Sequence, residues 1–457
     1  MTRRRNPSNI SRLSCLATTL AMPPAAALAA GEAGPDGDAS VAAEIDGLRR
    51  EIAELRREMG EAGSSWLTEA RAAQVRSLVQ EVLADADSRA SLQSSGATAG
   101  WDKGFFLASA DGNFKLKISG YAQIRWNYNY VDDPLPGQDR NAKGFENRRT
   151  YLTFEGHIID PTWIYKIQGN FRSSDGTFVL QDAYARKELG QGFYVQGGQA
   201  KAPYMRETLA SDTGLLTVDR SVIETVFGAG RTQGVFLGWS NDMFRVVGTF
   251  CDGSQAAGGL NSPWQQPTTE YAFIARGDIK LGEAEWSQYH DMTSFPGEKV
   301  SALIGAAILW QRGDAGSPLA GVETLAWTAD AEIDFGGANL FGAVVGRHLD
   351  SSSPGGVNAD QYGAYGQGGF FVAPQVELFG RYEWGDSDTG GEDFSAVTAG
   401  ANWYIAKQQL KLSGDVGYGF NGVSAFFGGP GTAQGWRPDA SGDGGQIVVR
   451  AQFQLMF

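Results

Sequence analysis

The last twelve residues of this 457-residue chain alternate between two kinds of side chain. One parity is wholly apolar and consists of Ile447, Val449, Ala451, Phe453, Leu455 and Phe457. The other parity is mostly polar and consists of Gln446, Val448, Arg450, Gln452, Gln454 and Met456. Successive side chains of a strand point to opposite faces of its sheet, so this period of two predicts a strand with one apolar and one polar face.

The same period of two returns in many segments after Trp101. The clearest are residues 114–128, 163–172, 325–335, 375–384 and 410–418. Because an apolar exterior needs lipid and a charged interior needs water, these strands do not suit a soluble barrel. Aromatic residues also lie near the ends of the apolar rows, as in the girdles at bilayer interfaces; they are Trp126, Tyr128, Trp163, Trp384 and Trp403. The pattern therefore predicts an all-β fold, an antiparallel transmembrane β-barrel.

Composition agrees with a barrel and excludes other classes. The chain has 62 glycines and 11% aromatic residues, and no run approaches the roughly 18 apolar residues of a transmembrane helix. Its formal net charge of −14 argues against nucleic-acid binding, which requires a basic face. The candidate strands number about sixteen or seventeen, and since bacterial single-chain barrels have even numbers we expect 16. A barrel of that size leaves an aqueous channel open.

The N-terminus has the pattern of a secretory signal peptide. Its basic part carries Arg3, Arg4, Arg5 and Arg12. A short apolar stretch follows, and the sequence Ala27-Leu28-Ala29 fits a cleavage site. We therefore expect residues 1–29 to be removed on export.

A short heptad pattern follows within residues 30–62. Apolar residues spaced alternately by three and four are Ile45, Leu48, Ile52, Leu55 and Met59. Acidic and basic residues at the flanking positions favour parallel helices in register, so we expect a periplasmic coiled coil; the alternative is an amphipathic helix that lies on its own chain. Residues 63–100 follow as a second helix and a Ser/Gly/Ala linker, and residues 101–457 form the barrel domain.

The longest connection between predicted strands comprises residues 202–230. Loops longer than about fifteen residues usually have a function, and in a channel that function is to fold inside and narrow the lumen. The alternative is a loop on the outer surface. Four basic residues bracket or occupy this connection: Lys201, Arg206, Arg220 and Arg231.

Six short segments, in the expected order, resemble the phosphate-selective porin O and P family. They are residues 118–123, 147–152 leading into 160–163, 182–184, 198–203, 218–221 and 230–235. The resemblance implies a homotrimeric, 16-stranded outer-membrane porin whose third loop folds inside, with Arg and Lys residues of these segments able to face the pore. The closing Phe457 likewise resembles the signal that the barrel assembly machinery reads.

Charged residues of the polar parity divide the predicted lumen into two walls. The basic wall contains Lys115, Lys117, Arg125, Arg149, Lys166 and Arg172. Together with the four basic residues of the long connection, these are the predicted pore and anion-binding residues. The opposite acidic wall contains Asp330, Glu332, Asp334, Glu377 and Glu383. Two such walls set up a transverse field that orients polar solutes. We therefore predict passive diffusion of small hydrophilic solutes, and leave open whether these are anions such as phosphate, since anion selectivity needs rings or ladders of Arg and Lys.

The sequence offers little for an enzyme. His157, His290 and His348 lie far apart, and no HExxH, GxSxG or GK[ST] motif is present. We expect no catalytic residues, no metal and no cofactor. Paired carboxylates such as Asp330 and Glu332 could serve an outer-membrane hydrolase, but in a barrel they more often line water. A structural barrel whose N-terminal helices bind the cell wall is the other alternative, and it could coexist with transport.

Overall fold

The structure is a computed structural model that describes residues 97–457 except 255–268, 315–319, 353–357, 389–390 and 440–442, and six isolated residues nearer the N-terminus. The chain divides into two units, Met1–Arg89 and Ala90–Phe457. The isolated residues are helical: Gly47, Arg50, Ala53, Glu54, Ser77 and Gln80. The predicted signal peptide and all five heptad positions lie outside the described residues, so both stay predictions. No helix among the described residues is long and apolar enough to cross a membrane.

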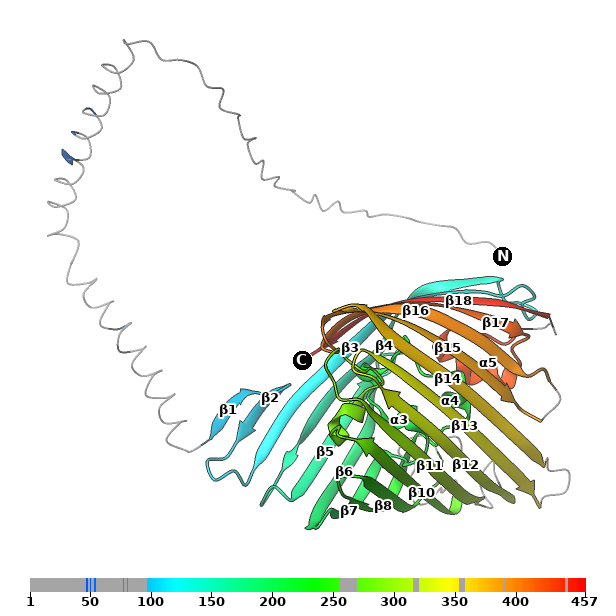
Figure 1. The fold of residues 1–457 in the computed structure, drawn as a ribbon, viewed down its shortest axis with the longest axis horizontal. Coiled ribbons are helices and arrows are strands. Elements are labelled where there is room, and N and C mark those ends of the chain that lie inside the picture. Colours follow the sequence, from blue (N-terminus) through cyan, green and yellow to red (C-terminus); the bar gives the residue numbers. More distant parts are fainter. Residues whose placement is uncertain are drawn as a thin grey trace, which may run out of the picture. The chain divides into compact units, whose positions relative to one another are not determined.

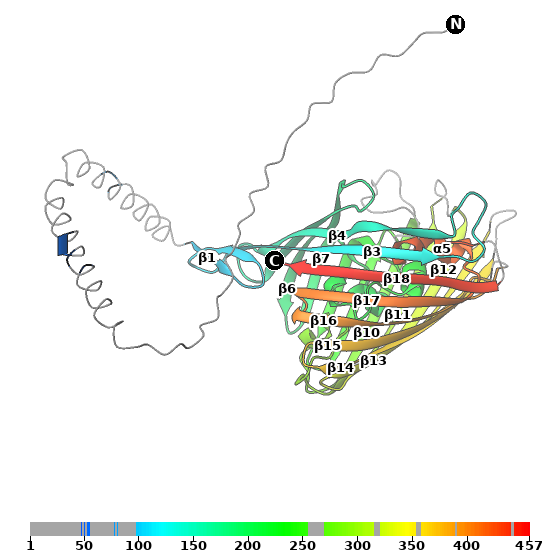
Figure 2. The same ribbon diagram turned by 90° about the horizontal axis from the view of Figure 1, so that it is seen from above.

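Strands β3 to β18 form a closed antiparallel barrel, which Figure 1 and Figure 2 show as a continuous wall of tilted strands. Their bounds are β3 (Lys115–Tyr130), β4 (Asn141–His157), β5 (Trp163–Phe171), β6 (Phe178–Gly190), β7 (Phe193–Lys201), β8 (Arg231–Ser240), β9 (Phe244–Cys251), β10 (Thr269–Gly282), β11 (Ser301–Gly313), β12 (Val322–Asp334), β13 (Ala338–Ser351), β14 (Ala359–Ala373), β15 (Val376–Asp386), β16 (Phe394–Ala406), β17 (Leu410–Asn421) and β18 (Asp443–Met456). β18 closes the barrel on β3, from Ile447 opposite Tyr130 to Met456 opposite Tyr121. The 16-stranded barrel predicted from the period of two is therefore confirmed.

Two short strands precede the barrel and extend its sheet to 18 strands. β1 (Thr98–Trp101) pairs with β2 (Phe105–Ala108), and β2 pairs with β3 over Lys115–Ile118, a stretch of β3 that β18 does not reach. Strands of four residues are too short to show a clear period of two, so the sequence did not predict this hairpin.

Burial along the strands follows the two parities. On β3, Gln123 and Arg125 are buried, whereas Ile124 between them is 45% exposed. On β12, Glu332 is buried and its neighbour Ile333 is exposed. Polar side chains thus fill the inside of the barrel, and apolar side chains cover the outside, as in a barrel surrounded by lipid.

The two ends of the barrel carry different connections. Phe457 and the short connections lie at one end, called the turn end here; these connections are residues 158–162, 191–192, 241–243, 335–337, 374–375 and 407–409. The opposite end, called the loop end, carries residues 131–140, 172–177 and 202–230 in that order along the chain. Residues 202–230 are therefore the third loop, as the resemblance implied.

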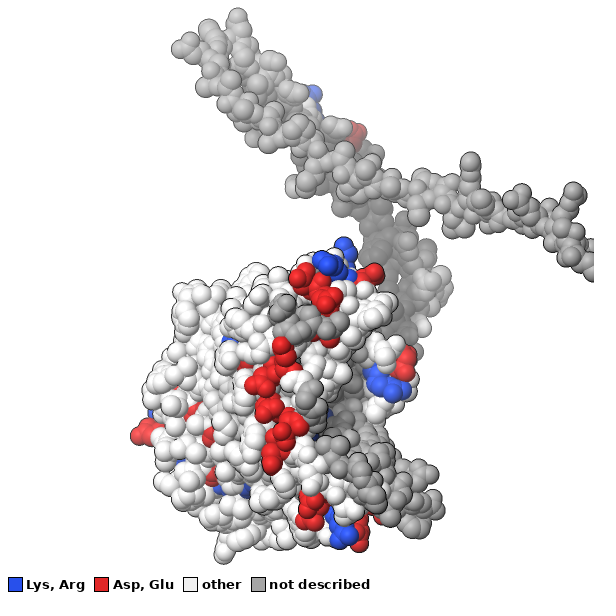
Figure 3. Space-filling model, turned by 90° about the vertical axis from the view of Figure 1, so that its right-hand side faces the viewer, with Lys and Arg blue, Asp and Glu red and all other residues white. Residues whose placement is uncertain are grey.

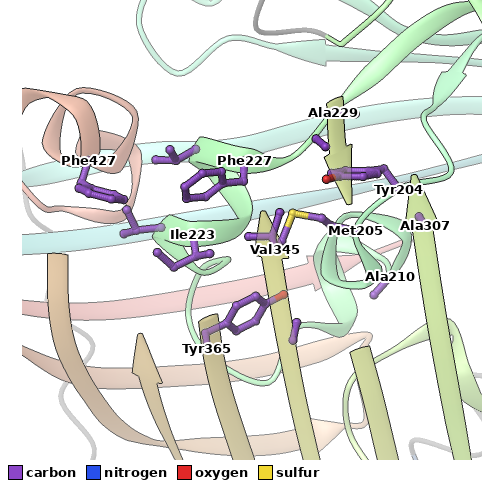
Figure 4. Packing of buried hydrophobic residues seen from close by; sticks show 14 of the residues in the cluster. Tyr204, Met205, Ala210, Ile223, Phe227, Ala229, Ala307, Val345, Tyr365 and Phe427 are labelled. Atoms are coloured by element: carbon purple, nitrogen blue, oxygen red, sulfur yellow. The ribbon is translucent and has the colours of Figure 1, made fainter. Parts of the chain in front are cut away.

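Three connections contribute to the interior of the barrel. The third loop contains α3 (Arg206–Leu209), η1 (Asp212–Gly214) and α4 (Val222–Phe227); residues 283–300 contain η3 (Trp286–His290); and residues 422–439 contain α5 (Ala425–Gly431) and η4 (Thr432–Gln434). Their apolar side chains join buried wall residues in one core. The ring of Phe227 on α4 lies 6.1 Å from that of Phe426 on α5, and Figure 4 shows Ile223 and Phe227 near Phe427. The residues from 283 to 300 meet the third loop from the turn end, where the Met292 N–H donates to the Gly214 carbonyl at 2.8 Å.

Candidate functional site in the barrel lumen

Asp219 fastens the third loop to the inside of β3 and β4. Its carboxylate accepts hydrogen bonds from Arg125 at 2.7 Å, from Arg148 at 2.8 Å and from Arg149 at 2.7 Å. Burial alone would raise the pKa of Asp219, but the three guanidinium groups hold it well below its usual range. Arg125 and Arg149 are predicted pore residues, whereas Arg148 is not among them, because a β-bulge at that position breaks the period of two.

A second carboxylate of the third loop, Asp212, repeats this arrangement. It forms an ion pair with Arg220 of the same loop, lies 3.8 Å from Arg149, and accepts a hydrogen bond from the Tyr121 hydroxyl at 2.8 Å. Burial would raise the pKa of Asp212, but Arg220, Arg149 and other nearby cations hold it well below its usual range. The Lys201 ammonium donates instead to the Ala210 carbonyl at 2.8 Å.

The opposite side of the third loop is bound to the wall of β12 and β15. Arg206 donates to Glu332 at 3.0 Å and to the Tyr289 carbonyl at 2.6 Å, and Glu207 pairs with Arg381 of β15. Burial raises the pKa of Glu207 to about 7, although Arg381 opposes that rise. Arg206 therefore joins the third loop, the 283–300 connection and the barrel wall.

The five residues of the predicted acidic wall are all buried and all have partners. Asp330 accepts two hydrogen bonds from Arg276 of β10, each of 2.8 Å, and Glu332 accepts one from Arg206. The other three accept as follows: Asp334 from Gln288, Glu377 from Asn402 and Tyr404, and Glu383 from the Val222 N–H. Several of these partners come from the inward-folded connections, so this wall is covered by them.

Three residues of the predicted basic wall lie apart from the third loop. Lys115 and Lys117 belong to the part of β3 that pairs with β2, and their ion pairs are with Asp102 at 3.7 Å and Glu155 at 3.4 Å. Arg172 follows the end of β5 at the loop end and pairs with Asp175 at 3.1 Å. The structure does not bring these three residues together with the other predicted pore residues.

A cavity of about 660 Å³ lies between the third loop and the wall formed by β5 to β10. Its basic lining residues are Lys166, Arg186, Lys201, Arg231, Arg245 and Arg276. Its acidic lining residues are Asp182, Glu188, Asp212 and Asp278. Six basic groups against four acidic ones leave a positive balance. Two of the predicted residues meet here on one carboxylate, because Lys166 and Arg231 contact Asp182 at 3.1 and 2.6 Å.

Sequence reasoning missed Arg186, Arg245 and Arg276 among the basic lining residues. All three lie on strands, and Arg186 shares the inward parity of Asp182 and Glu188 on β6. A count of charged residues by parity over β6, β9 and β10 would have found them. Their strands are short or interrupted by apolar inward residues, so the alternation there is weak.

The surface of the loop end has the opposite charge. Figure 3, which looks at the side of the molecule where the long connections lie, shows acidic side chains gathered in a stripe with few basic ones. Exposed acids at this end include Asp350, Asp360, Asp388 and Glu392. The loop-end surface and the lining of the cavity therefore differ in the sign of their charge.

Comparison with known proteins places the fold. The sequence model of the family described as phosphate-selective porin O and P matches residues 118–299. An anion-selective porin from Comamonas acidovorans is similar in structure, with a TM-score of 0.52 and 12% identity over 75% of this chain and 99% of that chain. A loop-deletion mutant of OmpT, an outer membrane protein of Vibrio cholerae, gives a TM-score of 0.49 and 13% identity over 75% and 99% of the two chains. No curated protein is similar enough in sequence to count as a relative.

The family match begins in β3 and extends through the third loop to residue 299, so it includes most of the cavity wall described above. The barrel fold and this match agree with a non-enzymatic channel of the outer membrane. Residues 118–299 are similar in sequence to the phosphate-selective porin O and P family.

Proposed function

We propose that this protein is a porin through which small hydrophilic solutes diffuse passively across the outer membrane, with a preference for anions. The observation that carries the proposal is the cavity beside the third loop, lined by six basic and four acidic side chains. Cations in a narrow, partly desolvated passage act on anions more strongly than in bulk water, because the effective dielectric constant is lower. Lys166, Lys201 and Arg231 serve this role in the proposal.

In the same proposal the third loop forms the constriction. Arg125, Arg149, Arg206 and Arg220 are buried or nearly so, and each pairs with a carboxylate. They act by holding the third loop in place, and the buried acids of β12 and β15 supply part of the opposite charge. The solute path then follows β5 to β10, the side on which the cavity lies.

The proposal includes the partners that the family implies. The exposed apolar side chains outside the barrel contact lipid, three copies associate as a homotrimer, and the strand that ends at Phe457 is read by the barrel assembly machinery. The helices before residue 97 lie in the periplasm.

Removal of the third loop tests the constriction directly. Lys201 pairs with Arg231 in the register of β7 and β8, so a short Gly-Ser turn can replace Arg206–Phe227 without moving the two strands. We expect the conductance in planar bilayers to rise several-fold. Replacing residues 135–138 of the first loop with the same turn is the matched control and should leave the conductance near its original value. An unchanged conductance after loss of the third loop would show that the loop does not limit the path.

A further inference from the structure

Two cavity arginines differ from the others in how their charge is compensated. Arg231 and Arg276 each lie within 2.8 Å of a carboxylate oxygen. Arg186 has one long ion pair among the described residues, at 3.9 Å to Glu188. Within the same part of the chain, the Arg245 side chain forms neither a hydrogen bond nor an ion pair, although Asp278 lies opposite Arg245 in the register of β9 and β10. Neither guanidinium group forms a hydrogen bond to a carboxylate that the structure describes, so both can donate hydrogen bonds to an anionic solute.

An aromatic ring supports each of these two guanidinium groups. The Arg186 guanidinium lies 4.0 Å from the ring centre of Tyr194 and 5.9 Å from that of Tyr184. Its Nε and Nη2 donate to Gln196 at 3.0 and 2.8 Å, so its orientation is fixed, and its Nη1 lies 3.9 Å from Glu188, too far for a hydrogen bond. The Arg245 guanidinium lies 4.2 Å from the ring centre of Trp286.

The ring of Tyr194 rests on bare backbone. A Cβ added to Gly238 of β8 would lie 2.1 Å from the Tyr194 ring, so only glycine leaves room for it there. Tyr184 and Tyr194 both line the cavity together with Arg186 and Arg245. This part of the cavity thus combines two tyrosine rings with two guanidinium groups that have no described carboxylate within hydrogen-bond distance.

We propose that Tyr184, Arg186, Tyr194 and Arg245 bind carboxylates that carry a flat apolar body, of which aromatic carboxylates are the simplest. A guanidinium group binds a carboxylate through two parallel hydrogen bonds in one plane. A ring joined to that carboxylate stays near the same plane and contacts the tyrosine rings, whereas inorganic phosphate can form the paired hydrogen bonds but has no apolar body to contact those rings. The inference rests on the proposed function, because it names the solute class for the cavity of that channel.

The test uses the full chain in planar bilayers and measures the concentration of each added anion that halves the chloride current. Benzoate, cyclohexanecarboxylate and inorganic phosphate are the probes, since the first two share a charge and differ in flatness. We expect benzoate to act at a concentration about five-fold lower than cyclohexanecarboxylate, the size of effect typical of one good aromatic contact. Phosphate should act at a higher concentration than benzoate.

Variants assign the effect to these side chains. Tyr184→Leu with Tyr194→Leu should abolish the difference between benzoate and cyclohexanecarboxylate, and the Phe variants should restore it. Arg245→Gln should weaken the block by both carboxylates about ten-fold, whereas Arg312→Gln, at an exposed ion pair with Glu270, should change neither.

Two results would overturn the inference. Equal block by the flat and the non-flat carboxylate would exclude the aromatic contact, and an unaltered block in Arg245→Gln would exclude the arginine. In both cases a persistent preference for chloride over potassium would leave the proposed function intact. A wild-type channel without that preference would instead contradict the proposed function itself.

Discussion

At the scale of single residues, one carboxylate organises the lumen. Asp219 is fully buried and binds Arg125, Arg148 and Arg149, three guanidinium groups from two neighbouring strands. Without Asp219 these groups would repel one another in a site of low polarity. The sequence could predict that Arg125 and Arg149 point inward. It could not predict that Asp219 is their partner, because loop residues do not alternate between two faces as strand residues do.

Asp219→Asn should release the third loop while the barrel stays folded. Removal of one partner from a buried ion pair typically costs about 3–5 kcal/mol, so we expect faster proteolytic cleavage within residues 202–230 and a noisier open-channel current. Asp133→Asn, at an exposed loop position, is the control and should change neither. If the third loop of Asp219→Asn stays as protected as in the wild type, Asp219 does not hold it.

The same carboxylate gives a pH dependence with a definite sign. Because the folded pKa of Asp219 lies well below its unfolded value of about 4, its stabilising contribution is complete above that value and is lost only as the pH falls through the folded pKa. Between about pH 5 and pH 8, titration of Asp219 should therefore leave the rate of proteolytic cleavage of the wild-type third loop unchanged. A marked rise in cleavage near pH 5 that is absent from Asp219→Asn would contradict the depressed pKa.

At the scale of elements, closure of the barrel depends on how β18 meets β3. Phe457 exchanges two backbone hydrogen bonds of 2.9 Å with Gly120. A Cβ on Gly120 would lie 2.6 Å from the Phe457 ring, so that ring packs on the glycine. β2 then pairs with β3 immediately beyond this point. The sequence predicted this last strand and its final aromatic residue. It could not predict that Gly120 lies against Phe457, because that depends on the register between β18 and β3.

Gly120→Val should therefore impair assembly in the same way as deletion of Phe457. When refolded into detergent micelles, both variants should fold slowly, so that more of the protein stays unfolded. On gels, this unfolded protein migrates at the same position with and without heating, whereas the folded barrel shifts on heating. Gly277→Ala, on β10 where an added Cβ meets nothing within 4 Å, should assemble normally. Normal assembly of Gly120→Val would show that the packing of Phe457 on this glycine is dispensable.

At the scale of the whole molecule, the period of two predicted the wall but not its contents. Alternation fixes which side chains of a strand face inward, and burial on β3 and β12 follows it. The filling of the lumen depends on connections, and residues 283–300 show the limit. They were not expected to fold inside, yet Tyr289 and Met292 are buried there. Apolar residues in a connection have no periodicity that would reveal which surface they cover.

The reversal potential of the wild-type channel in a tenfold KCl gradient tests the central claim most directly. We expect a reversal potential with the sign of chloride preference, both at a mean KCl concentration of about 0.1 M and at about 1 M. Exposed acids at the loop end are screened over about 10 Å at 0.1 M and more strongly at 1 M, whereas the cations of the cavity are partly buried and are screened less. A potential of the opposite sign at both concentrations, or a potential of zero with open channels, would contradict an anion-preferring passage beside the third loop.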